Sequence, residues 1–584
     1  SHCGGKLRWD EAAVMFRPAP ERGAPTGARG EVTTRCAGSA NGHLATAAGL
    51  ADAAAAGRAA AEAAGHAAQP APEHAVVEPA EEPIAAHWFS PAEGKYHHGT
   101  KHFVDFQNDV TAADVMLAAR EGYESVEHTK RYTTLGMATD QGKTSNINGL
   151  ALLAEQLGVT IPEVGTTTFR PPYTPISFGA IAGQAKGALF KPVRRTAMDA
   201  WHARNGADWE PVADWRRPYC YRRGREGRAE AVRREVLNTR QRVGLLDAST
   251  LGKIVVAGPD AAAFLDRVYT GTMSTLKVGR CRYGLMCNEN GFLFDDGVVA
   301  RLAEDRFLCH TTTGGSDRVH GHLEEWLQTE WWDLSVHTLN VTEQWAQVAV
   351  AGPDARRVLQ AAGTDIDLSA AALPFMAWAE GQVAGIPARV YRISFSGELG
   401  FEVAVPADQG LALWHALLAA GEAFGAMPYG TEALHVMRAE KGFIMIGDET
   451  DGTVTPQDLG LGWAVSKKKD DFIGKRAQAR VDLTRTGRKQ LVGLLTEEPG
   501  QRLPDGAHAV ARICPAPMRT IGHVTSTYHS PTLGRSIAMA LIEDGRALVE
   551  AGAVLSFPLE GGKVMRARCV EPVFYDPAGE KLHA

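Results

Sequence analysis

The sequence has 584 residues, which is enough for several domains, and 45% of them are hydrophobic, an ordinary share for a globular protein. The net charge of −7 is small for this length, with both signs interspersed, so nothing indicates a nucleic-acid groove. No apolar run reaches the roughly 18 residues of a membrane-spanning helix. The 8 cysteines form no Cys-x-x-Cys pair, which argues against a zinc ribbon or a redox pair and favours a reducing cytoplasm.

Residues 1–67 have the pattern of the end of a larger domain. The chain opens Ser-His-Cys-Gly-Gly without an initiator Met, so we expect a fragment or a processed chain. Val32 to Thr34 predict a strand, and an Ala-rich helix follows a glycine-containing turn. This helix is either a low-complexity surface helix or the last helix of a dinucleotide-binding domain, with its N-terminus facing a cofactor. Residues 68–94, rich in Pro, Ala and Glu, predict a linker.

Residues 95–165 predict a small helical unit. Thr111 is a good N-cap for the segment AADVMLAAREG, which ends at a glycine. Ser145 or Asn148 can begin a second helix that Gly158 ends. The glycines and the capping residues therefore predict two helices in this part of the chain.

Metal binding is not indicated in this unit. No cysteine lies between Cys36 and Cys220, so the number of ligands excludes an iron–sulfur cluster here. His97, His98 and His102 lack further ligands at the spacing of a metal site, and we interpret them as part of a solvated loop.

Between the two predicted helices, Thr129, Lys130 and Arg131 supply a hydroxyl and two cations. That combination suits a phosphate group, and it is equally compatible with a surface turn. The following residues 166–190 contain TTTFRPPYTP, which proline stiffens, and we expect an extended arm along a neighbouring molecule.

An internal repeat organises residues 191–485. Ile254-Val-Val-Ala-Gly-Pro-Asp-Ala recurs as Val348-Ala-Val-Ala-Gly-Pro-Asp-Ala, and each copy predicts a strand, a Gly-Pro turn and a helix. Two βαβ-like halves around a ligand site would follow. Residues 486–584 contain several short strand patterns, KQLVGLLTE, GHVTSTYHSP, RSIAMALIE and VEPVFYDP, which predict a small β-barrel.

Two adjacent acids mark the central stretch of this region. The turn Asn288-Glu-Asn-Gly291 joins two apolar runs, as in a hairpin, and Asp295 and Asp296 follow in the second run. They are either solvated acids at the edge of a turn or buried acids with a function, because burying an unused acid is costly. Strand alternation would send the two carboxylates to opposite faces.

Four ordered motifs resemble the glycine-cleavage T-protein (aminomethyltransferase) family. They are the Gly-x-x-x-Asp-Asp strand that ends at Asp296, the segment Phe395-Ser-Gly-Glu-Leu-Gly-Phe-Glu402, the segment Arg438-Ala-Glu-Lys-Gly, and the segment Thr455-Pro-Gln-Asp-Leu-Gly-Leu-Gly-Trp. The stretches KRYTTLGMATDQGKTSN, TTTFRPPYTP, TEQWA and PYGTEALHVMRAEKG resemble one subgroup over essentially the whole chain, the alpha subunits of heterotetrameric sarcosine oxidases.

The resemblance implies a multidomain α+β fold. Its expected parts are a remnant of an FAD/NAD-type dinucleotide-binding domain (1–67), a linker (68–94), a small helical domain with an arm at a subunit and flavin interface (95–190), an aminomethyltransferase-like folate domain (191–485) and a C-terminal β-barrel (486–584).

The resemblance also implies roles for individual residues. Asp296 matches the catalytic carboxylate beside the reactive folate nitrogens. Glu402 would accept hydrogen bonds from the aminopyrimidine edge of the folate, and Glu398 is expected to be structural. The remaining folate contacts would be Thr312, Arg438, for which a core ion pair is the alternative, and Phe395, where the family has Tyr and only ring stacking can survive. Ser39, Leu44 and Thr46 would touch NAD, in a site incomplete in this chain, and Thr129 and Lys130 would touch FMN at an interface.

The implied activity is that of a sarcosine oxidase subunit. The assembly would demethylate sarcosine oxidatively to glycine with release of hydrogen peroxide, and would transfer the one-carbon unit to tetrahydrofolate to give 5,10-methylenetetrahydrofolate. Beta, gamma and delta subunits would be the partners, with FAD on the beta subunit and FMN between beta and this chain. A stand-alone aminomethyltransferase and a non-catalytic folate-binding scaffold are the alternatives, since fold does not imply function.

Overall fold

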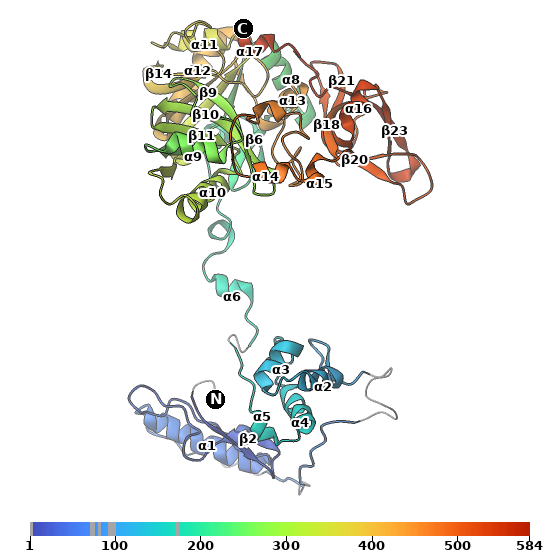
Figure 1. Ribbon diagram of the computed structural model, residues 1–584. Coiled ribbons are helices and arrows are strands. Elements are labelled where there is room, and N and C mark those ends of the chain that lie inside the picture. Colours follow the sequence, from blue (N-terminus) through green and yellow to red (C-terminus); the bar gives the residue numbers. More distant parts are fainter. Residues whose placement is uncertain (1–3, 71–75, 80–82, 91–100, 171–173) are drawn as a thin grey trace. The chain divides into compact units, whose positions relative to one another are not determined.

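The computed structural model describes residues 4–70, 76–79, 83–90, 101–170 and 174–584. The chain divides into two compact units, Ser1–Lys186 and Gly187–Ala584. Figure 1 shows the elements of each unit. His97 and His98, and the Pro-Pro-Tyr of the predicted arm, lie outside the described residues.

The first part of the N-terminal unit contains a hairpin and one long helix. Val32 to Thr34 do not form the predicted strand, because Val32 makes only an isolated bridge to Thr26 and no neighbouring strand pairs with it. The predicted Ala-rich helix is present as α1. The elements are β1 (Leu7–Asp10), β2 (Met15–Pro18), the 3₁₀ turn η1 (Gly38–Asn41) and α1 (Thr46–Ala63).

The second part of this unit is the predicted helical bundle. Thr111 caps α2 through a capping box with Asp114, and Gly158 ends α4 with a φ of 66°, a conformation that glycine adopts without strain. The segment with Thr129 forms the helix α3 rather than a surface turn, because Val126 and Leu135 anchor it in the core of the unit. The elements are β3 (Phe103–Asp105), β4 (Val110–Thr111), α2 (Ala112–Arg120), α3 (Val126–Thr133), α4 (Asn146–Leu157) and α5 (Ile161–Val164).

The segment predicted to be an extended arm is partly helical. Ser177 has an extended backbone and caps a short helix by accepting a hydrogen bond from Ala180 N, and a 3₁₀ turn follows. The elements are α6 (Phe178–Ala182) and η2 (Gly187–Leu189).

Two sheets form the centre of the C-terminal unit, and their strands pair antiparallel except for the parallel pair β7–β17. One has the strand order β12-β8-β11-β10-β9 and the other β14-β15-β16-β13-β7-β17. Side chains from both sheets, among them Cys281, Ala300, Tyr391 and Ala404, pack in one buried cluster where the sheets meet. The strands are β7 (Gly244–Asp247), β8 (Gly252–Ala257), β9 (Cys281–Cys287), β10 (Leu293–Ala303), β11 (Arg306–Thr311), β12 (His337–Asn340), β13 (Trp345–Ala351), β14 (Trp378–Val383), β15 (Ile386–Tyr391), β16 (Gly400–Pro406) and β17 (Met427–Pro428).

The internal repeat is confirmed, but its halves are not βαβ units. The copies are β8 with α9 and β13 with α11, each joined by a Gly-Pro turn. The strand after each helix belongs to a hairpin, β9–β10 or β14–β15, and a short hairpin turn forces antiparallel pairing. The helices of this region are α7 (Asp199–Arg204), α8 (Arg228–Gln241), α9 (Ala261–Val268), α10 (Ser316–Thr329), α11 (Ala355–Ala362), α12 (Gly410–Gly421) and α13 (Thr431–Glu440), and a separate hairpin is formed by β5 (Ala207–Val212) and β6 (Trp215–Tyr221).

The C-terminal strands close into the predicted barrel, with the order β18-β21-β20-β19-β22-β23. Of the predicted strand VEPVFYDP only Val570 lies in a strand, because the N–H groups of Phe574 and Tyr575 bond to the carbonyl of Glu440 at the end of α13. The elements are α14 (Lys475–Gln478), α15 (Val481–Thr484), β18 (Lys489–Thr496), β19 (His508–Val510), β20 (Thr520–Ser530), β21 (Arg535–Glu543), α16 (Gly545–Glu550), β22 (Val554–Pro558), β23 (Val564–Val570) and α17 (Glu580–His583). Among the described residues, no helix has the length and apolar character that crossing a membrane requires.

Candidate active site

The hairpin of β9 and β10 holds Asp296 against Tyr283. Asp296 lies opposite Leu285, and Tyr283 is two residues further along the same face. The Tyr283 hydroxyl donates a hydrogen bond of 2.5 Å to Oδ2 of Asp296. Burial raises the pKa of Asp296 to about 7, the Tyr283 hydrogen bond opposes that rise, and the charge of Asp295 adds to it. A carboxyl group with this pKa can take up a proton near neutral pH.

Asp295 has a different environment from its neighbour. It is fully buried and accepts hydrogen bonds from Asp296 N at 2.8 Å and from the Thr312 hydroxyl at 3.1 Å. A side chain at Gly315 would collide with it, since a Cβ there would lie 1.8 Å from Oδ2 of Asp295. The alternative of two solvated acids is therefore wrong, and Asp295 links β10 to the start of α10. Thr312 contacts Asp295 and not Asp296.

Glu402 lies on β16 of the other sheet and is 8% exposed. The side-chain amide of Gln347, on the adjacent strand β13, donates a hydrogen bond to Oε2 of Glu402. Burial raises the pKa of Glu402, while this hydrogen bond and the positive charge of Lys253 act against the rise.

Phe395 is half-buried in the loop between β15 and β16. Its ring stacks on Phe443, with the centroids 6.1 Å apart and an interplanar angle of 17°. Trp463, in the 3₁₀ turn Gly462–Ala464, is 72% exposed, and its ring centroid lies 6.1 Å from that of Tyr283 on the β9–β10 hairpin. Aromatic side chains therefore lie next to the hairpin that carries Asp296 and in the loop before β16, the strand that carries Glu402. Such side chains can stack on a flat ring system.

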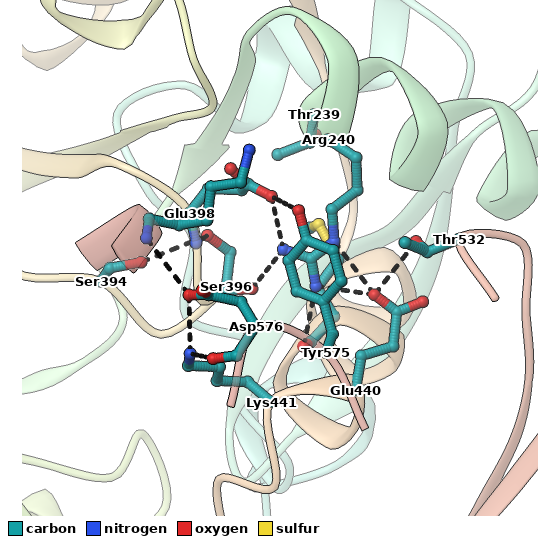
Figure 2. Close-up of polar contacts among 12 residues, drawn as sticks. Thr239, Arg240, Ser394, Ser396, Glu398, Glu440, Lys441, Thr532, Tyr575 and Asp576 are labelled. Atoms are coloured by element: carbon teal, nitrogen blue, oxygen red, sulfur yellow. Dashed lines mark hydrogen bonds and ion pairs between the residues drawn. The ribbon is translucent and has the colours of Figure 1, made fainter. Parts of the chain in front are cut away.

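Figure 2 shows the cluster of charges that holds the loop carrying Phe395. Arg240 donates to the carbonyl of Ser396 at 2.8 Å and to Oε1 of Glu398 at 3.1 Å, and it pairs with Glu440 at 2.7 Å. From beyond the barrel, the Tyr575 hydroxyl donates to the same oxygen of Glu398 at 2.7 Å. Glu398 is thus buried and structural, as predicted, and the C-terminal segment takes part in fixing this loop.

Arg438 lies in the core ion pair that the sequence left as an alternative. It is 0% exposed, and its guanidinium bonds to Glu449 at 2.7 Å and to Asp448 at 3.2 Å. It also donates to the hydroxyl of Ser526 on β20 at 2.7 Å. These bonds tie α13 to the barrel and leave no exposed part of the guanidinium for a ligand.

Thr129 and Lys130 lie inside the helical part of the N-terminal unit. The Thr129 hydroxyl donates to the carbonyl of Tyr123 at 3.1 Å, and the Lys130 ammonium donates to the carbonyl of Thr168 at 2.8 Å. They are 0% and 5% exposed, and burial lowers the pKa of Lys130. Both polar groups already bond to main-chain carbonyls, so they do not fit the binding of a phosphate group.

Ser39, Leu44 and Thr46 are exposed around the start of α1. The turn before the helix is organised by Asp52, which accepts a hydrogen bond from Gly38 N at 2.9 Å. The first N–H groups of a helix have no partner within the helix, and at the start of α1 that of Ala47 donates to the Glu78 carboxylate at 2.7 Å. An acid of the chain itself thus meets the end of the helix where an anionic ligand would bind.

Three residues of the site did not stand out in the sequence. Tyr283 could have been found from the hairpin register, since a two-residue period places it on the face of Asp296. Gln347 and Lys253 gave no signal, because their proximity to Glu402 depends on how distant strands pair and pack.

Three family models match the chain. The GCVT N-terminal domain matches residues 198–469, the glycine cleavage T-protein C-terminal barrel domain matches residues 489–576, and the sarcosine oxidase A3 domain matches residues 99–184. The two T-protein models cover the two sheets and the barrel that surround the site.

Individual relatives agree with these matches. The chain is 48% identical over 587 residues to the sarcosine oxidase subunit alpha of Corynebacterium sp. (strain U-96), which covers 99% of this chain and 59% of that protein. It is 37% identical to an aminomethyltransferase of Streptomyces coelicolor, over 61% of this chain and 91% of that protein. The crystal structure of the aminomethyltransferase T of Bartonella henselae superposes with a TM-score of 0.57 at 28% identity, over 66% of this chain and 99% of that chain.

The extent of the alignments differs between the two groups of relatives. The chain spans between 49% and 59% of the length of the sarcosine oxidase alpha subunits that it matches, but nearly all of the aminomethyltransferases. The chain therefore belongs to the aminomethyltransferase (glycine cleavage T-protein) family, and over nearly its whole length it is similar to alpha subunits of sarcosine oxidase.

Proposed function

We propose that this chain is the folate-binding part of a sarcosine oxidase alpha subunit. The complete cytoplasmic assembly would oxidise the N-methyl group of sarcosine, give glycine and hydrogen peroxide, and pass the one-carbon unit to tetrahydrofolate, forming 5,10-methylenetetrahydrofolate. The observation that carries the proposal is the half-buried Asp296, held by Tyr283 and with its pKa raised to about 7, in a chain 48% identical to such a subunit.

Asp296 would act as the general base of the transfer. When a folate nitrogen attacks a one-carbon iminium or formaldehyde, the nitrogen must lose a proton, and a carboxylate with a pKa near 7 accepts it efficiently at neutral pH. While ionised, the carboxylate also stabilises the positive charge of the iminium. The hydrogen bond from Tyr283 would hold the carboxylate in place for both tasks.

Glu402 and Phe395 would bind the folate ring. An ionised carboxylate accepts hydrogen bonds from the N–H groups of an aminopyrimidine, and such charge-assisted bonds are stronger than neutral ones. Phe395, stacked on Phe443, offers an aromatic face. Thr312 would contribute through Asp295, and Arg438 through the packing of the barrel.

The oxidation itself would take place on partner subunits. A flavin supplies the two-electron chemistry of amine oxidation, and we expect FAD on a beta subunit and FMN between that subunit and this chain, with gamma and delta subunits completing the heterotetramer. Thr129 and Lys130 do not fit an FMN phosphate, because their side chains bond to main-chain carbonyls. NAD at Ser39, Leu44 and Thr46 would need residues outside this chain.

A stand-alone aminomethyltransferase is the second candidate. It is favoured by the match to 91% of a protein with that name. The additional unit Ser1–Lys186, with its sarcosine oxidase A3 match, favours the oxidase subunit. A scaffold that only binds folate would bind the ligand and fail to transfer the carbon.

The test is calorimetric titration of the full chain with (6S)-5-formyltetrahydrofolate, a stable reduced folate. We expect one site per chain, and at least a tenfold loss of affinity in Glu402→Ala, since an unpaired buried group costs about 1–3 kcal/mol. Glu498→Ala, an exposed acid of the barrel, is the matched control. Absence of binding to the unaltered chain would contradict the proposed function.

A further inference from the structure

The carboxylate of Glu402 lies in a buried polar cluster whose other members the proposed chemistry does not use. Gln347 is 0% exposed, and its amide nitrogen donates to Oε2 of Glu402 from the adjacent strand. This bond commits one oxygen of the carboxylate to the protein. Among the described residues no hydrogen bond to the other oxygen, Oε1, is formed, so that oxygen is available to a ligand.

Lys253 is the cation of this cluster and comes from the other sheet. It is 1% exposed, and its ammonium donates to the carbonyls of Ser249 at 3.1 Å and Leu251 at 2.8 Å. Two main-chain acceptors thus fix this charge, and one of them, Ser249, also accepts a hydrogen bond from Gln347 N through its hydroxyl at 3.0 Å, which places Lys253 next to the Gln347–Glu402 pair. A buried ammonium is costly unless a negative charge balances it, and Glu402 and Asp247 provide that balance.

The remaining groups around Glu402 carry no charge at neutral pH. Cys281 on β9 and Tyr429, just before α13, both interact with the Glu402 charge, and burial raises the pKa of Cys281 to about 12 and that of Tyr429 further still. Tyr391, the cross-strand neighbour of Glu402 on β15, is also buried, and its pKa is raised by burial. Lys253 is therefore the group in this set that supplies positive charge.

We propose that Gln347 and Lys253 are positioning residues that hold Glu402 ionised and oriented, with Oε1 turned to the N–H edge of an aminopyrimidine ligand. The inference rests on the proposed function, because it concerns how the same site recognises the folate ring. Gln347 acts through a hydrogen bond that fixes the rotamer of Glu402, and Lys253 acts through its charge.

The physical reason is that the N–H groups at the edge of the ligand need hydrogen-bond acceptors. An ionised carboxylate only accepts hydrogen bonds, whereas a protonated one presents an O–H group to the ligand's N–H donors and repels them. Burial alone would favour the protonated form. The Gln347 amide and the Lys253 ammonium both favour the ionised form, so removing either makes Glu402 protonate at a higher pH.

The experiment measures the affinity of the full chain for (6S)-5-formyltetrahydrofolate between pH 5 and pH 9. The variants are Gln347→Leu and Lys253→Met, with Gln347→Met as a second substitution that keeps the side-chain volume if the first impairs folding. Lys469→Met is the matched control, because its ammonium likewise donates to two main-chain carbonyls, those of Tyr269 and Gly271, but the acid beside it is Asp266. Near-ultraviolet circular dichroism verifies that each variant is folded.

We expect the unaltered chain to lose affinity as the pH falls through the pKa of Glu402, because the protonated carboxyl group presents an O–H to the ligand's donors. In Gln347→Leu and Lys253→Met the acid limb should move to higher pH, with affinity at pH 7 reduced about three- to tenfold. Lys469→Met should keep the acid limb in place.

If folded Gln347 and Lys253 variants keep the acid limb of the unaltered chain, the inference is overturned. If Lys469→Met moves the limb as much as Lys253→Met does, the effect is one of general destabilisation and the inference is also overturned. If the unaltered chain binds no folate at any pH, the proposed function itself fails, which is a different result.

Discussion

The hydroxyl of Tyr283 lies 2.5 Å from Oδ2 of Asp296 and donates a hydrogen bond to it across the β9–β10 hairpin. This bond favours the ionised form of Asp296 against the burial that raises its pKa to about 7. Burial and the Tyr283 hydroxyl therefore act in opposite directions on the protonation of Asp296.

The first prediction concerns the pH dependence of the transfer. Tyr283→Phe removes a hydrogen bond to a charged group, worth about 1.5–3 kcal/mol, so the pKa of Asp296 should rise above 7 by about 1–2 units. Since the base form is active, formation of 5,10-methylenetetrahydrofolate should lose rate at neutral pH and recover at higher pH. The measurement is a pH–rate profile of the reconstituted complex. If the acid limb of the profile does not move, Tyr283 does not influence the protonation of Asp296.

The second prediction distinguishes the two adjacent acids. Asp296→Ala should leave amine oxidation intact and reduce folate-dependent capture of the carbon by about 10²–10⁴, the usual effect of losing a general base, with free formaldehyde accumulating. Asp295→Ala should instead lower the free energy of unfolding by about 1–3 kcal/mol, because the Thr312 hydroxyl and Asp296 N lose their acceptor. A product-partition assay and denaturant unfolding of both variants decide this. Loss of capture in Asp295→Ala alone would reverse the two assignments.

The third prediction concerns Arg438. Arg438→Met leaves Glu449 buried without its cation, which should lower the free energy of unfolding by about 3–5 kcal/mol. Arg476→Met, which removes an exposed cation paired with the exposed Asp471, is the control and should have a much smaller effect. The measurement is urea unfolding followed by tryptophan fluorescence. A stable Arg438→Met variant with reduced folate affinity would restore the direct folate contact.

The fourth prediction concerns the end of the chain beyond the barrel. Tyr575→Phe removes the hydrogen bond to Glu398 and should cost about 1 kcal/mol of stability. Because Glu398 belongs to the loop of Phe395, folate affinity should fall severalfold as well. Tyr132→Phe, in the other unit, is the matched control and should leave the affinity unchanged. Equal folate affinity in both variants would show that the C-terminal segment does not influence this loop.

The fifth prediction concerns the short helix α6. Phe178 is 91% exposed and Ile181 70% exposed, and apolar side chains presented together promote association. We expect the isolated chain to self-associate in light scattering, and the double variant Phe178→Ser/Ile181→Ser to do so less. Val481→Ser, which removes another strongly exposed apolar side chain, is the control. A monodisperse unaltered chain would contradict the expectation that this segment needs a partner.

Local features of the sequence determined much of the secondary structure. The caps at Thr111 and Gly158, the turn at Asn288 and the Gly-Pro repeat each depend on a few adjacent residues, and each is present. The strand at Val32 failed for the converse reason. A strand needs a paired neighbour, and the sequence around Val32 does not supply one.

The different surroundings of the two acids were also accessible to the sequence, because alternation along one strand separates Asp295 from Asp296. The surroundings of Glu402 were not accessible. Gln347 lies 55 residues from Glu402 along the chain, and Lys253 belongs to a different sheet. Antiparallel pairing of β13 with β16 brought Gln347 to Glu402, and the packing of the two sheets added Lys253. The tertiary structure therefore decided which charges face Glu402, since burial and pairing between sheets, rather than any local pattern, set its protonation.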